Sequence, residues 1–442
     1  MRRHRTQLRY SLRCGSRHNP EEGVVISLVA VFMLFVVGAM AALSIDVVTM
    51  YTARSEAQLA ADAAALAGAR VLANSGMTSY PGVAWVFSAD NLAKGVAVQV
   101  AEQSQVGGTY LTAANVLPPV FGGTDTNPTV TVKVQITNLP TFFARIWGTK
   151  FVTVGASATA EAYNPLRTSG SVGATTPVAP TCVKPWLLPN IDPTNSPNPI
   201  FDPVSGAITA GSNLLGWSSS TPVTGVQMSP RCGASGNCAG PPAPARWSYY
   251  PGDDATFPHP NNSLPTCSLI PTLTDYQKSI VGCIQTPISC NRPATNIDIS
   301  NYPPRNAETA DAVNCLTHAA TGNGDTVTTN LTPPPVGPFE FVAGADNPVA
   351  VAYPALALQD VMVSDSLVTV PVFDTASFTP GSNTVTIVGF VQLFLNPDGA
   401  AAPPSGDVST TVINIAGCGT GATGTPILGN GASPVAVRLI SP

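Results

Sequence analysis

Charged side chains are scarce in this sequence. Asp, Glu, Lys and Arg make up 10% of its 442 residues, whereas about a quarter of the residues in a typical globular protein are charged. The charges are also segregated: residues 1–22 hold six arginines and two glutamates, and residues 46–442 hold 14 basic and 23 acidic side chains. The larger part is mildly acidic and lacks the basic stripe of nucleic-acid-binding proteins, so we expect no nucleic-acid partner.

Motifs for enzymatic chemistry are also missing. The sequence has no GxSxG nucleophile elbow, no HExxH zinc pair and no GxxxxGK[ST] phosphate-binding loop. Beyond the basic N-terminal segment the histidines are His259 and His318, and neither belongs to a catalytic motif. The runs Asp253-Asp254 and Asn323-Gly324-Asp325 supply fewer oxygen ligands than calcium needs, which favours surface loops. We therefore predict a non-enzymatic protein with no catalytic, cofactor-binding or metal site, and no cofactor.

No CxxC pair occurs, although the sequence has nine cysteines. Cys14 lies in the basic segment, and the other eight follow the hydrophobic stretch described below. An even number of cysteines on one side of a membrane favours disulfide bonds in an oxidising compartment over a zinc site. The candidate disulfide cysteines are Cys182, Cys232, Cys238, Cys267, Cys283, Cys290, Cys315 and Cys418. Their connectivity stays open, and a Cys182–Cys418 pair is one hypothesis.

A long uncharged stretch follows the basic tail. Residues Gly23–Ile45 contain no charged side chain, and a helix of that length rises about 34 Å, enough to cross the hydrocarbon core of a bilayer. Because the arginines concentrate in residues 1–22, we predict a single-pass transmembrane helix with a cytoplasmic tail and the bulk of the chain outside.

Two other interpretations of this stretch stay open. It could be a signal peptide cleaved near the small-x-small sequence Ala39-Met40-Ala41, or a buried helix of a soluble protein. Gly38 and Ala42 lie four residues apart and form a small-xxx-small pair. They are therefore the candidate residues for packing against another membrane helix.

Alanine dominates the next segment, residues 46–74, which contains no proline. We predict that it is helical and continues the membrane helix without a break. Small residues recur there at three- and four-residue spacing, at Ala53, Ala57, Ala60, Ala64, Ala67 and Val71. Such a stripe allows another backbone to approach closely. The partner is open: either a neighbouring subunit, which would mean self-association, or the chain's own sheet.

The pattern then changes from helix to strand. Residues 91–105 have apolar residues at helical spacing, and Ser88-Ala89-Asp90 offers an N-cap before them. Residues 129–137 alternate strictly between polar and β-branched side chains, and residues 150–161 are predicted as the antiparallel partner strand. Residues 46–163 are therefore predicted to form a small α+β module of two helices on a short sheet.

Three regions are predicted after this module: a flexible linker at 164–181, a Pro/Cys-rich irregular region at 182–353 and a β-rich domain at 354–442. Strands are expected in the last region at Val361–Phe373, Thr384–Leu395, Val408–Ile415 and Val435–Ile440, and a β-sandwich or partial barrel is the expected architecture. The predicted fold class is α+β, with a transmembrane helix continuing into the Ala-rich helix, the small α+β module, a loop-rich disulfide region and a C-terminal all-β domain.

Two phrases carry a resemblance to a known family. The first is Ser44-Ile45-Asp46 with the run QLAADAAALAGA at residues 58–69, and the second is LPTFFARIWG at 139–148 followed by the alternating residues 152–160. Together with the basic tail and apolar helix, they resemble the N-terminal module of TadE/TadG-like proteins, assembly components of Flp-type (tight-adherence) pili. The resemblance covers about residues 20–165.

The resemblance has two departures. Relatives that are processed like pilins have a glutamate five residues after a glycine, whereas Leu28 stands there after Gly23. Some relatives carry a von Willebrand A domain with an Asp-x-Ser-x-Ser metal motif, and Asp374-Thr375-Ala376-Ser377 does not match its spacing. Neither processing of this kind nor that metal domain is therefore expected.

The resemblance implies a structural or assembly component of an Flp-type pilus or related envelope apparatus. It would be anchored in a bacterial inner membrane, with the N-terminus cytoplasmic and the bulk periplasmic. Its partners would be the lipid bilayer and pilus-assembly or other envelope proteins. The alternative is an envelope-displayed adhesin or binding protein that uses the same anchor.

Overall fold

A computed structural model gives the fold. It describes residues 20–79, 86–165, 176–195, 197–204, 206–209, 214–216, 226–228, 273–282, 287–288, 293–295, 306–318, 324–328, 337–345, 347–354, 360–361, 364–376, 384–397, 408–418, 427–429 and 433–441. The chain divides into two compact units, one of residues 1–55 and 136–154, and one of residues 56–135 and 155–442. Each unit is described by itself below.

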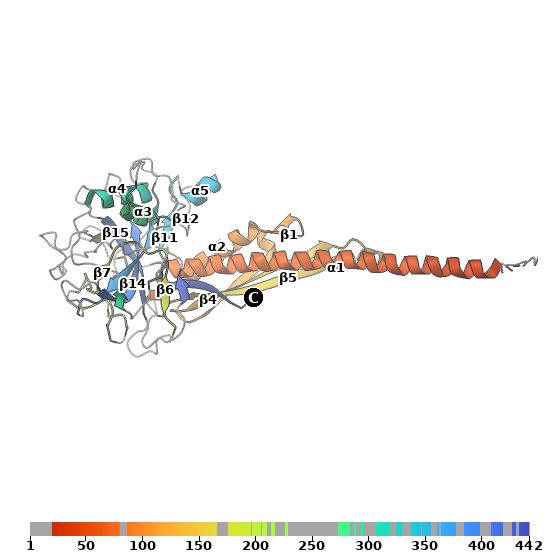
Figure 1. Ribbon diagram of the computed structural model, residues 1–442, viewed down its shortest axis with the longest axis horizontal. Helices are drawn as coiled ribbons and strands as arrows, with labels where there is room; N and C mark the ends of the chain where they lie inside the picture. The colour runs from red at the N-terminus through yellow and green to blue at the C-terminus, as the bar shows by residue number, and fades with distance from the viewer. Residues whose placement is uncertain are drawn as a thin grey trace, which may run out of the picture. The chain divides into compact units, whose positions relative to one another are not determined.

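One helix, α1 (Pro20–Asn74), contains both the apolar stretch and the alanine-rich segment (Figure 1). The prediction that the two are continuous is therefore confirmed. Its 55 residues correspond to about 82 Å of helix at 1.5 Å per residue. Within the described part of the chain it is the one helix long and apolar enough, by length and composition, to cross a membrane.

The second helix, α2 (Val86–Glu102), confirms the prediction of a helix in this region. It buries an alanine at every fourth position, at Ala89, Ala93, Ala97 and Ala101. The predicted N-cap is wrong, because Ser88 and Asp90 lie inside the helix, which starts at Val86. The turn-rich break before α2 contains the short 3-10 helix η1 (Met77–Ser79).

A four-stranded sheet has the order β17-β5-β4-β3. Its strands are β3 (Val116–Gly123), β4 (Pro128–Pro140), β5 (Phe151–Tyr163) and β17 (Ala436–Ser441). In β4 the alternating valines at 130, 132 and 134 are fully buried, as the period-2 pattern predicted. The last strand, β17, pairs antiparallel with β5, with Ala436 opposite Tyr163. The C-terminal end of the chain therefore completes a sheet that begins 320 residues earlier.

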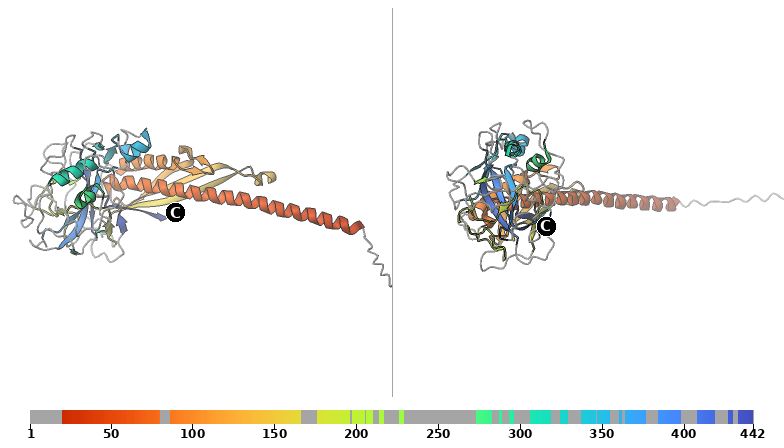
Figure 2. Two further views of the ribbon diagram at one scale, coloured as in Figure 1. Left: turned by 45° about the horizontal axis from the view of Figure 1, so that its top comes forward. Right: turned by 60° about the vertical axis from the view of Figure 1, so that its left-hand side comes forward.

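A six-stranded sheet forms the centre of the larger unit (Figure 2). Antiparallel β13 (Leu367–Phe373), β14 (Thr384–Leu395) and β15 (Val408–Gly417) follow one another in it. The bounds of β14 are those predicted, whereas β13 starts six residues later and β15 ends two residues later than predicted. Short strands β7 (Leu188–Pro189) and β8 (Val226–Met228) form its edges, and β9 (Pro293–Thr295) pairs with the first residues of β14. Every residue of β13 and β15 is buried, so both faces of this sheet are covered.

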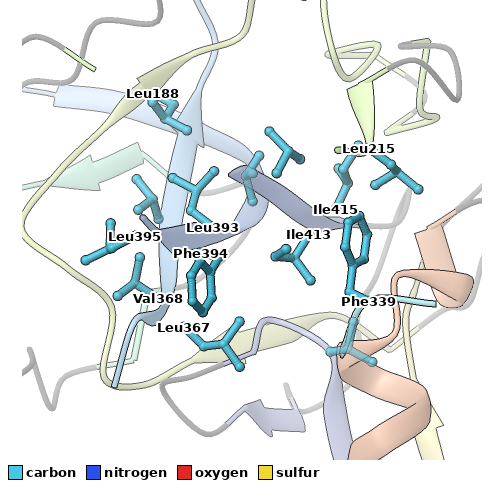
Figure 3. Packing of buried hydrophobic residues seen from close by; sticks show 14 of the residues in the cluster. Leu188, Leu215, Phe339, Leu367, Val368, Leu393, Phe394, Leu395, Ile413 and Ile415 are labelled. Carbon is cyan, nitrogen blue, oxygen red and sulfur yellow. The ribbon is translucent and has the colours of Figure 1, made fainter. Parts of the chain in front are cut away.

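The hydrophobic core of this unit joins segments that are far apart in the sequence. Leu367, Val368, Leu393 and Phe394 of the sheet pack in one cluster with Phe339 (Figure 3). Side chains from the last turn of α1, from α3 (Asp275–Val281) and from α4 (Asn306–Leu316) belong to the same cluster. The region predicted as irregular, 182–353, thus contains two helices that contribute to the core.

Smaller elements complete the described chain. They are β1 (Gln105–Val106), β2 (Thr109–Tyr110), the 3-10 helices η2 (Ala113–Asn115) and η3 (Ala144–Trp147), β6 (Val178–Pro180), β10 (Thr326–Thr328), β11 (Glu340–Val342), α5 (Pro348–Ala352), β12 (Asp360–Val361) and β16 (Ile427–Gly429). Strand β6 pairs in parallel with β16, and β10, β11 and β12 form a three-stranded antiparallel sheet.

The predicted disulfide framework stays a prediction. Cys182, Cys315 and Cys418 lie among the described residues, and Cys418 is fully buried. Cys232, Cys238, Cys267, Cys283 and Cys290 lie outside the described residues, as does Cys14.

Candidate membrane-anchoring site

The first half of α1 presents large apolar side chains that the described residues leave exposed. Phe32, Leu34 and Phe35 are each more than 60% exposed, and the most apolar 18-residue window of the helix has no buried residue. An uninterrupted apolar surface of this size is characteristic of a segment covered by lipid or by another protein. Gly38 is exposed, and a Cβ added there would meet no atom within 4 Å, whereas Ala42 is partly buried.

The apolar stretch ends at a buried carboxylate, Asp46, which is 1% exposed. Its oxygens accept hydrogen bonds from the backbone N–H groups of Phe142 (2.9 Å), Phe143 (3.0 Å) and Ala144 (2.6 Å). We call this set of three bonds the Asp46 clasp. Because Phe143 is the N-cap of η3 and supplies no side-chain acceptor, the aspartate of α1 satisfies N–H groups at the start of that short helix.

The clasp also sets the charge state of the aspartate. Burial on its own raises the pKa of Asp46, but the N–H donors of Ala144, Phe142 and Phe143 outweigh it and hold the pKa below the usual value. The carboxylate is therefore ionised at neutral pH. Because the pKa of Asp46 is lower in the folded state, its ionised carboxylate stabilises the fold at any pH above the ordinary aspartate pKa. This stabilisation is lost as the pH falls through the lowered pKa.

The clasp holds residues 141–151, which we call the hairpin tip: the loop between β4 and β5 together with Phe151, the first residue of β5. The loop is closed by backbone hydrogen bonds from Thr141 to Lys150 (3.2 Å) and from Thr149 to Ala144 (3.2 Å). Gly148 ends η3 with a φ of +97°, in the left-handed region that glycine adopts without strain. The hairpin tip is thus an ordered turn with its own hydrogen bonds.

Large apolar side chains of the hairpin tip point away from the protein. Phe142 is 62% exposed, Ile146 73%, Trp147 62% and Phe151 56%. Arg145 and Lys150 are exposed among them, and residues 139–151 include no acidic side chain. The hairpin tip therefore combines an uncovered apolar surface with two positive charges.

The second half of α1 buries its small residues within its own chain. Ala53, Ala57, Ala60, Ala61, Ala64, Ala65 and Ala69 are at most 1% exposed; we call them the alanine face. A Cβ on neighbouring Gly68 would lie 3.3 Å from Val130 of β4 and 3.5 Å from the carbonyl of Ala93 in α2. Gln58 donates to the carbonyl of Ser157 in β5 (3.2 Å). Of the two interpretations left open, the structure favours packing on the chain's own sheet and α2.

The end of α1 is joined to the central sheet by buried polar groups. Asn414 of β15 donates to the carbonyl of Ala73 (2.6 Å), and Gln392 of β14 donates to the side chain of Asn74 (2.9 Å). Ser79 of η1 exchanges two hydrogen bonds with the backbone of Ile415 (3.0 and 2.6 Å). Because unpaired polar groups are costly in a core, these bonds fix the helix end in one position on the sheet.

The remaining sequence candidates do not assemble into a reactive site. His318 lies 4.0 Å from Asp365, and both side chains are partly exposed. Asp325 accepts hydrogen bonds from the N–H of Gly344 and the amide of Asn347, so its carboxylate orders a loop. His259, Asp253, Asp254 and Asn323 lie outside the described residues. Within the described ranges no three His, Cys, Asp or Glu side chains gather as metal ligands would.

Two buried charged residues were not singled out from the sequence. Asp46 was recognised only as part of a motif, although a lone acid directly after 23 uncharged residues was the available signal. Lys184 is 7% exposed and donates to the carbonyls of Ile280 and Gly282 at the C-terminal end of α3. Burial lowers the pKa of Lys184 to about 8, while nearby Asp365 acts in the opposite direction.

Comparison with known proteins bears on this region. Residues 23–71 match the protein family described as "putative Flp pilus-assembly TadE/G-like". The match contains the apolar stretch, Asp46 and the alanine face, which confirms the resemblance there. The second phrase, at residues 139–160, lies outside the matched range. No curated protein and no solved structure matches the chain.

Proposed function

We propose that this protein is a membrane-anchored structural component of the apparatus that assembles an Flp-type pilus. The family match supports the proposal most directly, because it coincides with α1 and with no other helix. Residues 23–45 cross the inner membrane, the basic tail stays in the cytoplasm and the remaining residues lie outside. The family is one of pilus-assembly proteins and supplies no expectation of catalysis.

The contacts of α1 suggest how such a component works. The same helix carries the apolar stretch at one end and is hydrogen-bonded to the central sheet at the other. One continuous helix therefore joins the apolar stretch to the larger unit.

The exposed face around Gly38 is the proposed contact with another membrane helix. Small residues four apart let two helices approach closely in lipid, where packing replaces the hydrophobic effect as the driving force. Gly38 is exposed, and a Cβ there would meet no atom within 4 Å, so packing against the described residues does not account for its small size. A membrane helix of the pilus apparatus is therefore the proposed occupant.

Deletion and complementation test this function. In the organism that encodes the chain, deletion should abolish surface pili, and the full-length chain should restore them. Gly38→Leu should reduce both piliation and co-purification of apparatus proteins, whereas Val37→Leu, at a similarly exposed neighbouring position, should reduce neither. A deletion strain with normal piliation would contradict the proposal.

The adhesin alternative needs a test on the whole exterior. Residues 182–442 by themselves lack the partner strand of β17 and the end of α1, which belongs to the core cluster. A chain lacking only residues 1–45 keeps both. If the truncated chain bound to cells or surfaces as strongly as whole, piliated cells do, the result would favour the adhesin. If it did not bind, the result would favour an assembly role.

A further inference from the structure

We propose that the hairpin tip, residues 141–151, is a second membrane contact, which inserts Phe142, Ile146, Trp147 and Phe151 into the interfacial layer of the phospholipid bilayer beside α1. The inference rests on the proposed membrane anchoring and adds to it a contact far away in sequence. The family match does not include this segment.

The side chains of the hairpin tip have the chemistry of the membrane interface. Aromatic residues, tryptophan above all, concentrate where the hydrocarbon core meets the headgroups. All four apolar side chains are more than half exposed, although a water-soluble surface of this size would favour polar residues. We therefore expect this apolar surface to be covered by an apolar partner.

The charges of the hairpin tip select phospholipid as that cover. Arg145 and Lys150 are exposed in the same loop, with no acidic side chain among residues 139–151. Positive groups next to an apolar surface favour anionic headgroups, since their alkyl stems can lie along lipid while the charge reaches phosphate. A protein partner would more usually supply, or require, polar side chains at the rim of the contact.

The Asp46 clasp puts this surface at the right height. Asp46 directly follows Ile45, the last residue of the uncharged stretch, and one residue of helix rises only about 1.5 Å. Because Asp46 binds the N–H groups of Phe142, Phe143 and Ala144, the hairpin tip is held where α1 leaves the hydrocarbon core. The hairpin tip is thus attached next to the last residue of the uncharged stretch.

The closed turn makes insertion favourable. The loop is already ordered by its own hydrogen bonds and by the clasp, so little conformational entropy is lost on insertion. Two contacts, a helix and a hairpin tip, would fix the tilt and rotation of α1, which a single helix leaves free. The clasp residue is then a positioning residue for the membrane contact.

Fluorescence of Trp147 tests the contact in the full-length protein. The chain is reconstituted into nanodiscs of phosphatidylcholine and phosphatidylglycerol, with or without bromine atoms on the acyl chains. Bromolipid should quench the part of the emission that is lost in Trp147→Phe, which is about one fifth of the signal if the five tryptophans emit equally. The emission of Trp147→Phe, which includes that of the fully buried Trp186, is measured in the same nanodiscs and subtracted as the reference.

Two further variants separate positioning from folding. Asp46→Ala should lower the bromolipid quenching of Trp147 at least twofold, whereas Asp62→Ala, which removes another α1 carboxylate, should leave it unchanged. Unchanged circular dichroism would show that the hairpin tip moved without loss of the fold. Full quenching in Asp46→Ala would contradict the positioning role.

Each pattern of quenching supports or overturns the proposal. Quenching by bromolipid supports it. Quenching of Trp147 only by iodide in the water, or by neither agent, would overturn it, since the hairpin tip would then face solvent or a protein. If the chain itself did not stay in the nanodisc, the proposed anchoring would fail instead, so the two failures are distinguishable.

Discussion

Close packing of the alanine face predicts opposite effects for the same substitution at two helical glycines. A Cβ on Gly68 of α1 would lie 3.3 Å from Val130, whereas Gly95 of α2 is exposed and a Cβ there would meet nothing within 4 Å. Replacing glycine by leucine in a helix gains about 0.8 kcal/mol from backbone preference at either position. Gly95→Leu should therefore stabilise the protein by about that amount.

Gly68→Leu has the same gain in helix preference, but overpacking lowers its free energy of unfolding. The first carbon already requires Val130 to shift by a few tenths of an ångström, and three further carbons have no room between α1, α2 and β4. Overpacking of a core costs about 1–3 kcal/mol, so Gly68→Leu should be less stable than Gly95→Leu by about that amount. The difference between the two variants isolates packing, because the helix preference cancels.

Urea unfolding of the full-length chain in detergent, followed by circular dichroism, measures this difference from the shift in midpoint. If Gly68→Leu were as stable as Gly95→Leu but changed the oligomeric state, the alanine face would pack against another subunit. That result would refute packing of the alanine face on the chain's own sheet and α2.

Two other predictions concern the exterior. Because burial lowers the pKa of Lys184 from 10.5 to about 8, the folded protein releases this proton at a lower pH than the unfolded chain does. The free-energy cost of burying the charged lysine is therefore complete below pH 8 and decreases as the pH rises above it. Raising the pH from 7 to about 9.5 should therefore stabilise wild type by about 2 kcal/mol relative to Lys184→Met, and parallel pH profiles in urea unfolding would contradict the burial. Gly76→Ala should destabilise by about 2–4 kcal/mol, because its φ is +82° and the added Cβ would lie 2.8 Å from Phe339 and from the carbonyl of Ile413. Gly337→Ala, in open space, is the control for thermal unfolding and should change little.

Local periodicity predicted most of the longer helices and strands of this protein. Uninterrupted alanine and apolar residues predicted the continuous α1, and strict alternation predicted β4 and its buried valines. Apolar runs bounded by turns placed β13, β14 and β15. These signals are local, so a single sequence contains them.

Pairings between distant residues could not be predicted in the same way. Nothing in the pattern of β17 distinguishes the edge beside β5 from an edge of the central sheet, because both would bury alternate side chains. The Asp46 clasp joins residues about 97 apart through backbone N–H groups, which carry no sequence signature. The alanine stripe was visible, but its partner depended on tertiary structure.

Accessibility of two positions on either side of the apolar stretch tests the membrane anchoring most directly. Leu59 is 67% exposed on α1 beyond the stretch, and Cys14 lies before it. In spheroplasts expressing Leu59→Cys, a membrane-impermeant maleimide should label residue 59 above the wild-type background. The same reagent should label Cys14 only after the membrane is permeabilised. Loss of that signal in Cys14→Ser identifies it as Cys14. Labelling of Cys14 in intact spheroplasts, or recovery of the chain in the soluble fraction, would contradict the account.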